Sequence, residues 1–326
     1  MADLPRVYVT RALPAEALAP LQGVAEVQGW PEAEVPVPRD VLLTAAARAG
    51  GLLVLLTDRV DADLLAAAPR LRGVSTMSVG HDHMDVAACT RRGIPVCHTP
   101  DVLTETTADL AFALLMAAAR RLYEGQRVVV QGRWPAWSPF FLAGHDVHGR
   151  TLGIVGLGRI GQAVARRARG FDMRILYSGR RDRPEAAELG ARRVPLRELA
   201  ARSDFVVLLA ALTEETRHLV DADLLGRMQP TAILVNAARG GLVDEAALVR
   251  ALREGRIAGA ALDVFEREPL PVDHPLLALP NVVAVPHVGS ATVATRMAMA
   301  RLAAHNLADV LAGRRPRYCL NPETLA

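Results

Sequence analysis

The chain has 326 residues, of which 51% are hydrophobic and 22% charged, and its formal net charge is only +3. This composition predicts a soluble globular protein of about two domains with a large core. The small net charge argues against nucleic acid as a main partner. The longest apolar run, at 110–119, is too short for a membrane span, and the N-terminus lacks the apolar region of a signal peptide. We therefore expect a cytoplasmic protein with no membrane contact.

The cysteines and histidines give no sign of a metal site. Cys89, Cys97 and Cys319 lack the spacing of a metal site or a disulfide framework, which fits packing thiols in a reducing compartment. The stretch GHDHMD at 80–85 alternates acids and histidines without a closed ligand set. We expect no bound metal.

Short apolar segments alternate with Ala/Leu-rich segments in the first hundred residues. They predict strands at 7–10, 52–56, 73–77 and 95–98, and helices at 14–21, 41–49 and 62–68. Strands that alternate with helices indicate βαβ units and a parallel sheet.

A long helix is predicted at 104–122, with Thr104 or Thr106 as its N-cap, and residues 125–150 are expected to be irregular. A second alternating series follows. Its predicted strands are 152–156, 174–177, 205–209, 232–236, 259–262 and 282–285, and a final helix spans 291–312.

No further strand follows the final helix in the second series, so we expect this helix to pack against the N-terminal unit. The predicted domains are 1–102 with 287–326, which is discontinuous, and 103–286. The predicted fold class is α/β, with two Rossmann-like, doubly wound parallel-sheet domains and a cleft between them.

A glycine pattern begins the second series. Gly156, Gly158 and Gly161 form G-x-G-x-x-G, which is a weak signal alone but here ends an apolar strand and begins a helix. The first glycine permits the tight turn, the second lets the backbone approach a pyrophosphate, and the third lets the helix pack on the strand. Residues 103–286 are therefore predicted to bind a dinucleotide, which leaves the other domain to bind the substrate.

The end of the next strand reads LYSGRR, at 176–181. Ser178 stands where NAD-binding units carry an acid for the ribose 2′-hydroxyl, and Arg180 and Arg181 follow it. Guanidinium groups pair with phosphate oxygens, so this stretch favours the 2′-phosphate of NADP. The alternative is a pair of solvated loop arginines, and the nearby Asp182 keeps use of NAD open.

Three polar side chains follow predicted strands of the second sheet. Arg239, Glu268 and His287 would meet at its carboxyl edge, where such sheets bind ligands. Arg239 would hold a carboxylate, His287 would donate a proton to a carbonyl oxygen, and Glu268 would hold the imidazole in one tautomer. Taken singly, each has a plainer interpretation, as an ion-pair partner, a solvated acid and a packed histidine.

Longer motifs surround these residues: GRIGQAVARR, NAARGGLVDEAAL, LDVFEREP and PHVGSAT. With them, the sequence resembles the D-isomer-specific 2-hydroxyacid dehydrogenases over almost its whole length. Within that family it is most similar to the glyoxylate/hydroxypyruvate reductases, through STMSVGHDHMD, TPDVLTETTADLA, GRW and LYSGRR.

The resemblance implies NAD(P)H-dependent reduction of glyoxylate or hydroxypyruvate by hydride transfer, with His287 as general acid and Arg239 and Glu268 as the other catalytic residues. The alternatives are a family member that acts on phosphoglycerate, D-lactate or a bulkier keto acid, and a non-catalytic NAD(H)-sensing protein. Asp263 would hold the nicotinamide amide. The implied cofactor-binding positions are Gly156, Gly158, Arg159, Ile160, Gly161, Ser178, Arg180, Arg181, Ala210, Leu212, Ala237, Asp263 and Gly289.

The resemblance also implies the substrate contacts. Backbone N–H groups of Val79 and Gly80 would bind the substrate carboxylate, beside Arg239 and His287, and Leu56 and Met77 would line the pocket. Trp137 would reach across a homodimer interface into the neighbouring site, with Trp134 as the near alternative.

Overall fold

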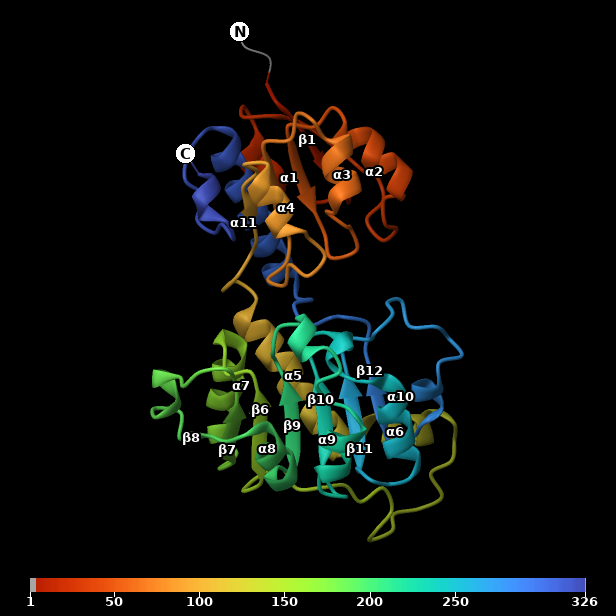
Figure 1. Cartoon of the computed structure of the whole chain (residues 1–326). Helices are drawn as coiled ribbons and strands as arrows, with labels where there is room; N and C mark the ends of the chain where they lie inside the picture. The colour runs from red at the N-terminus through yellow and green to blue at the C-terminus, as the bar shows by residue number, and fades with distance from the viewer. Residues whose placement is uncertain (1–3, 326) are drawn as a thin grey trace. The chain divides into compact units, whose positions relative to one another are not determined.

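The computed structural model describes residues 4–325, and the chain divides into two compact units (Figure 1). Unit 1 comprises Met1–Leu103 and Ala291–Ala326, and unit 2 comprises Thr104–Ser290. The predicted boundaries fell one and four residues earlier, at 102 and 287, so His287 belongs to unit 2 and not to the first domain. Among residues 4–325, no helix is both long and apolar enough to cross a bilayer.

Unit 1 is built on a five-stranded parallel sheet in the order β2-β1-β3-β4-β5. Its central strands are buried along their whole length, as expected for a parallel sheet covered on both faces. Helix α11 packs against α1, β3 and β4 although it lies at the far end of the sequence (Figure 1). The strands are β1 Arg6–Val9, β2 Glu26–Gly29, β3 Gly51–Val54, β4 Gly73–Thr76 and β5 Val96–Cys97, and the helices are α1 Ala15–Leu18, α2 Arg39–Ala46, α3 Ala62–Ala67, α4 Val86–Arg91 and α11 Val293–Leu311.

Unit 2 has a seven-stranded parallel sheet in the order β12-β11-β10-β9-β6-β7-β8. The strand order reverses between β9 and β6, which is where open α/β sheets bind ligands. The strands are β6 Thr151–Val155, β7 Arg174–Ser178, β8 Ala191–Arg193, β9 Phe205–Leu208, β10 Ile233–Asn236, β11 Gly259–Leu262 and β12 Val282–Ala284, and the helices are α5 Thr104–Ala119, α6 Leu122–Val130, α7 Arg159–Arg169, α8 Leu196–Arg202, α9 Ala222–Arg227 and α10 Glu245–Arg253.

Two apolar clusters cover the two faces of this sheet. In one cluster, side chains of α5 and α7 pack against alternate residues of the strands. In the other cluster, side chains of α8, α9 and α10 pack against the remaining strand residues. Both sheets are entirely parallel, so the predicted class of two parallel-sheet α/β domains is confirmed.

The long helix predicted at 104–122 is interrupted. Arg121 has a left-handed backbone, with φ of 51°, so α5 ends at Ala119 and α6 begins at Leu122. Helix α6 occupies part of the stretch that was predicted to be irregular. Strands β2 and β8 and helix α4 were also missed. The two strands carry no apolar run that would have revealed them.

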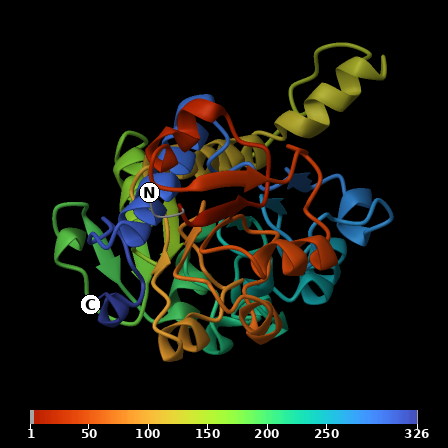
Figure 2. The ribbon, with the colours of Figure 1, turned by 90° about the horizontal axis from the view of Figure 1, so that it is seen from above.

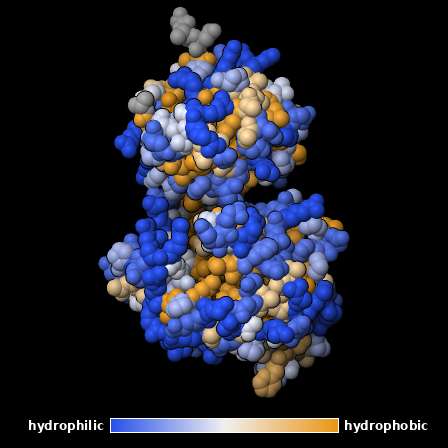
Figure 3. All heavy atoms as spheres, viewed as in Figure 1, coloured by the Kyte–Doolittle hydropathy of each residue, from blue (hydrophilic) through white to orange (hydrophobic). Residues whose placement is uncertain are grey.

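We call residues 122–143 the arm, because in Figure 2 this segment extends outward from the rest of unit 2. None of the α6 side chains is buried. Figure 3 shows apolar atoms gathered over the loop that follows α6, at the lower end of the view. The large exposed apolar side chains of the arm are Leu122, Tyr123, Val129, Val130, Trp134, Trp137, Phe140 and Phe141.

Candidate active site

The turn between β6 and α7 has the shape of a pyrophosphate cradle. Gly156 has φ of 98°, and a Cβ there would lie 2.8 Å from the backbone nitrogen of Ala210. At Gly161 a Cβ would lie 2.3 Å from the carbonyl oxygen of Gly156, so α7 packs directly on the turn. Gly158 faces open space, and no side chain caps the α7 N-terminus. The free N–H groups and the positive end of the helix dipole therefore suit a bound phosphate.

The end of β7 leaves two cations exposed. Ser178 is the last residue of the strand, and the side chains of Arg180 and Arg181 make no hydrogen bond or ion pair to any residue from 4 to 325. The neighbouring acid is engaged elsewhere, since Asp182 Oδ1 lies 3.1 Å from Arg193 Nη1. The acid that kept NAD use open is thus partly neutralised by an arginine of β8.

The predicted contact between His287 and Glu268 is formed. His287 Nδ1 lies 2.7 Å from Glu268 Oε2, and the backbone N–H of Phe265 donates to Glu268 Oε1 at 3.0 Å. Burial alone would raise the pKa of Glu268, but the hydrogen bond and charge of His287 outweigh it and lower that pKa, with help from the Phe265 N–H. The positive charge of Arg239 contributes to the same lowering, so the three predicted side chains share one electrostatic environment.

His287 is held in an uncommon backbone conformation. Its φ is 53°, which costs free energy for a residue other than glycine and recurs at functional sites. Its N–H donates to the carbonyl of Asp263 at 2.8 Å. The Asp263 carboxylate accepts hydrogen bonds from Val288 N at 2.6 Å and Gly289 N at 2.9 Å. Asp263 is 1% exposed, and this burial raises its pKa.

Asp263 therefore has a positioning role that the sequence did not reveal, because it shapes the turn that presents His287. The sequence showed that Asp263 lies at the end of a strand, β11. It did not show that Asp263 binds the N–H groups of Val288 and Gly289, because these residues follow a different strand, β12.

Arg239 follows β10 on a turn supported by a buried amide. Asn236 is 1% exposed, and its side chain donates to the carbonyl of Arg239 at 2.8 Å and accepts from Ala238 N at 3.1 Å. Gly240 must be glycine, because a Cβ would lie 1.8 Å from the carbonyl carbon of Phe265. The Arg239 turn therefore packs directly against the segment that carries Glu268.

A buried acid binds the backbone of the segment that carries Glu268. Glu245, in the first turn of α10, is 7% exposed. It accepts the N–H of Glu266 at 2.8 Å and lies 3.2 Å from His274 Nε2. Burial raises the pKa of Glu245. In the sequence its only signal was an acid at a helix start, which is weak because such acids usually complement the dipole.

The remaining implied cofactor positions also lie after strand ends of unit 2. Arg159 and Ile160 begin α7, Ala210 and Leu212 follow β9, and Ala237 and Gly289 follow β10 and β12. All are at the carboxyl edge of the sheet, as expected for a dinucleotide site.

Four implied substrate residues follow β3 and β4 in unit 1. Leu56 is half-buried and Met77 is 7% exposed. The N–H groups of Val79 and Gly80 donate no hydrogen bond within the described part of the chain. His98 Nδ1 lies 3.1 Å from the carbonyl oxygen of Val79 and holds this loop in place. Two adjacent free N–H groups suit a carboxylate.

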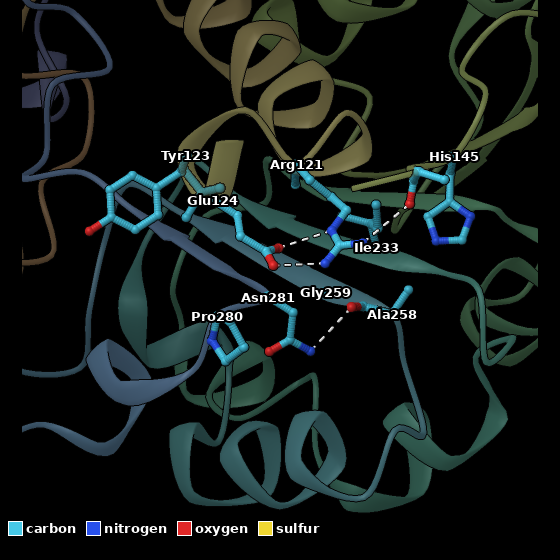
Figure 4. Close-up of a pocket in the computed structure, with 12 residues that line it drawn as sticks. Arg121, Tyr123, Glu124, His145, Ile233, Ala258, Gly259, Pro280 and Asn281 are labelled. Carbon is cyan, nitrogen blue, oxygen red and sulfur yellow. Dashed lines mark hydrogen bonds and ion pairs between the residues drawn. The ribbon is translucent and has the colours of Figure 1, made fainter. Parts of the chain in front are cut away.

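A cavity of about 220 Å³ lies elsewhere in unit 2, against the amino ends of β10, β11 and β12 (Figure 4). Inside it, the guanidinium of Arg121 makes two hydrogen bonds to Glu124, of 2.8 and 2.9 Å, and a third to the Ala143 carbonyl at 3.3 Å. This cavity is at the opposite edge of the sheet from His287. Its contacts join the two ends of the arm.

Across residues 4–325, no three His, Cys, Asp or Glu side chains are grouped so that they would hold a metal ion. The fold and the site together define a dinucleotide-binding α/β protein with a histidine–carboxylate pair at the same carboxyl edge of the sheet as the cofactor cradle.

The comparisons with known proteins identify the family. Residues 112–289 match the model of the D-isomer specific 2-hydroxyacid dehydrogenase NAD-binding domain. A glyoxylate reductase of Korarchaeum cryptofilum (strain OPF8) is 52% identical, with 98% of this chain and 97% of that protein covered. One of Thermococcus kodakarensis is 50% identical, with 98% and 97% covered. The chain belongs to the D-isomer-specific 2-hydroxyacid dehydrogenase family, as its motifs predicted.

Solved structures agree with this membership. A protein from Thermus thermophilus superposes with a TM-score of 0.90 at 47% identity, with 97% of this chain and 99% of that chain covered. An NADPH-dependent glyoxylate/hydroxypyruvate reductase from Sinorhizobium meliloti, crystallised with NADP and malonate, has a TM-score of 0.86 at 38% identity, with 98% of each chain covered.

Proposed function

We propose that this protein is an NAD(P)H-dependent reductase of small 2-keto acids, glyoxylate and hydroxypyruvate, in which His287 is the general acid. The observation that carries the proposal is the contact of 2.7 Å between His287 and Glu268, at the same carboxyl edge of the sheet as a glycine cradle that suits a dinucleotide. Relatives named glyoxylate reductase, about half identical over the whole chain, support the substrate class.

In this proposal each unit has one task. Unit 2 binds the dinucleotide, which supplies a hydride when it is bound in its reduced form. The free N–H groups of Val79 and Gly80 in unit 1 hold the substrate carboxylate. Arg239 orients and polarises the keto acid, and the protonated His287 delivers its proton to the keto oxygen. Glu268 keeps the imidazole in one orientation.

A steady-state panel tests the function directly. Glyoxylate, hydroxypyruvate, pyruvate, phosphohydroxypyruvate and a bulkier 2-keto acid are compared with NADPH and with NADH. The highest kcat/KM is expected with glyoxylate or hydroxypyruvate. Preference for another keto acid would overturn the substrate assignment, and no turnover with any of them would identify a binding protein.

We infer further that NADP is the preferred cofactor and that NAD is used less well. Arg180 and Arg181 are exposed just beyond Ser178, and a dianionic 2′-phosphate would satisfy both guanidinium groups. Asp182 is held by Arg193 through a contact of 3.1 Å, which weakens its repulsion of that phosphate.

Exchange of Arg181 for aspartate is expected to lower kcat/KM with NADPH by about tenfold or more, while kcat/KM with NADH changes little. The reason is the loss of a charge-assisted phosphate contact and the gain of a repulsive charge. Arg174→Asp is the matched control, because Arg174 is an exposed arginine at the other end of the same strand. Equal effects of the two exchanges on both cofactors would refute the phosphate assignment.

We also propose that the arm mediates a homodimer. Its exposed apolar side chains are too numerous for a surface that stays in water, and Phe140 is 86% exposed. The contacts of Arg121 with Glu124 and Ala143 fix the base of the arm, so it would dock as a preformed element. Trp137 is 80% exposed, whereas Trp134 already donates its indole N–H to the Ala136 carbonyl at 3.0 Å. This difference favours Trp137 as the side chain that reaches a neighbouring subunit's site.

Replacement of Trp137 by alanine is expected to raise KM for hydroxypyruvate by about tenfold, the usual order for truncating an interfacial aromatic side chain. Trp134→Ala serves as the control and should change KM much less. Sedimentation velocity should show a dimer for all three proteins. A monomeric wild-type protein, or a larger effect of Trp134→Ala, would contradict this assignment.

A further inference from the structure

The tail after α11 pairs with the edge of the unit 1 sheet. Strand β5 is the last strand of that sheet, and Cys97 on it forms an antiparallel bridge with Cys319. The N–H of Leu320 donates to the carbonyl of Val96 at 2.8 Å, which places a ladder bond beside the bridge. Two cysteines from distant parts of the sequence therefore face each other within one unit.

A buried asparagine fixes this pairing. Asn321 is 1% exposed, and its Oδ1 accepts the N–H of Val96 at 2.7 Å. Its Nδ2 donates to Thr90 Oγ1 at 3.0 Å and to the Ile94 carbonyl at 2.9 Å. Because these hydrogen bonds converge on one amide, the tail is held in register against β5.

The geometry of the bridge suits a disulfide. The ladder bond runs between the residues that flank the two cysteines, so the cysteines form the non-hydrogen-bonded kind of antiparallel pair. In such pairs the two Cα atoms are about 4.5 Å apart, within the range of about 4.4–6.8 Å that a disulfide spans.

The two sulfurs differ in reactivity. The neighbouring Cys97 thiol first, and the nearby backbone N–H groups of Asn321 and Val96, lower the pKa of Cys319 to about 7 although burial opposes them. In the structure Cys319 Sγ lies 3.4 Å from Asn321 Oδ1. Cys319 is half-buried, so a small oxidant reaches it, whereas Cys97 is fully buried. The third thiol, Cys89, is inert by comparison, since burial raises its pKa to about 11. Thiolate character and access together select the site of oxidation.

We propose that Cys319 and Cys97 form an oxidation site, in which a hydroperoxide oxidises Cys319 and Cys97 then closes an intramolecular disulfide. In the first step the Cys319 thiolate attacks a peroxide oxygen and the O–O bond breaks. The sulfur is oxidised to a sulfenic acid, and the leaving hydroxide takes up a proton to become water. In the second step the sulfur of Cys97 attacks that of Cys319, the S–O bond breaks, and the proton of Cys97 leaves with the hydroxyl as water.

The test is a thiol map of the full-length protein. The protein is reduced, freed of reductant, treated with a small excess of hydrogen peroxide at neutral pH, alkylated under denaturing conditions and digested with trypsin. The three cysteines fall in different tryptic peptides, at 73–91, 93–120 and 318–326. We expect 93–120 joined to 318–326, lighter by two hydrogens than the sum of the two, with Cys89 alkylated. Free thiols should fall from three to one per chain.

Two variants complete the test. Cys89→Ser should form the same cross-link, as the matched control. Cys319→Ser should retain both remaining thiols, because the buried Cys97 does not react first. Cys319 oxidised to sulfinic acid without a cross-link, a cross-link between two chains, or three intact thiols would overturn the proposal. Even if a variant fails to fold, the wild-type peptide map shows whether the Cys97–Cys319 cross-link forms. This result does not depend on which substrate the protein reduces.

Discussion

Replacement of His287 by alanine is expected to lower kcat for glyoxylate reduction by about 10²–10⁴-fold, the usual contribution of a positioned general acid. In the proposed mechanism His287 donates the proton to the keto oxygen, and Glu268 Oε2 lies 2.7 Å from His287 Nδ1. The cofactor cradle lies on β6 and α7 and does not include this side chain. Affinity for NADPH, measured by fluorescence titration, should therefore change little.

His148→Ala is the control for the loss of a histidine in unit 2, because His148 is exposed and lies on the turn before β6. It should retain the wild-type kcat. A wild-type turnover number in His287→Ala would rule out the general-acid assignment. A parallel loss of NADPH binding would instead show that His287 supports the fold of the cradle.

Replacement of Glu268 by glutamine is expected to lower kcat/KM for glyoxylate by about tenfold or more, because a hydrogen bond to a charged group contributes roughly 1.5–3 kcal/mol. Glu268 Oε2 lies 2.7 Å from His287 Nδ1, and its hydrogen-bond and charge partners lower the pKa of Glu268 despite burial. A neutral amide at this position loses the charge-assisted contact to His287.

The shape of the side chain is retained in this variant, because a glutamine carbonyl still accepts the Phe265 N–H that Glu268 Oε1 accepts at 3.0 Å. The measurement is kcat/KM for glyoxylate with saturating NADPH at neutral pH. Glu268→Asp, which retains the charge, should remain closer to the wild-type value. A wild-type kcat/KM in Glu268→Gln would mean that Glu268 acts only as a packing residue.

Much of the architecture was accessible from sequence because its signals are local. Buried parallel strands appear as short apolar runs, and the G-x-G-x-x-G pattern appears between a strand and a helix. The missed elements lack such signals. Strand β2 is exposed at all four positions, and strand β8 reads Ala-Arg-Arg, so neither presents an apolar run. The break before α6 depends on one left-handed residue, Arg121, which propensity does not reveal.

The fold class, the family, the cradle and the identity of the three candidate catalytic side chains could all be inferred from sequence, because each depends on residue types at short spacing. Other contacts became evident only in three dimensions. The support that Asp263 gives to the His287 turn and the facing of Cys97 and Cys319 join residues from different strands or segments. Such contacts depend on strand order and register, which long-range packing sets and local sequence does not encode.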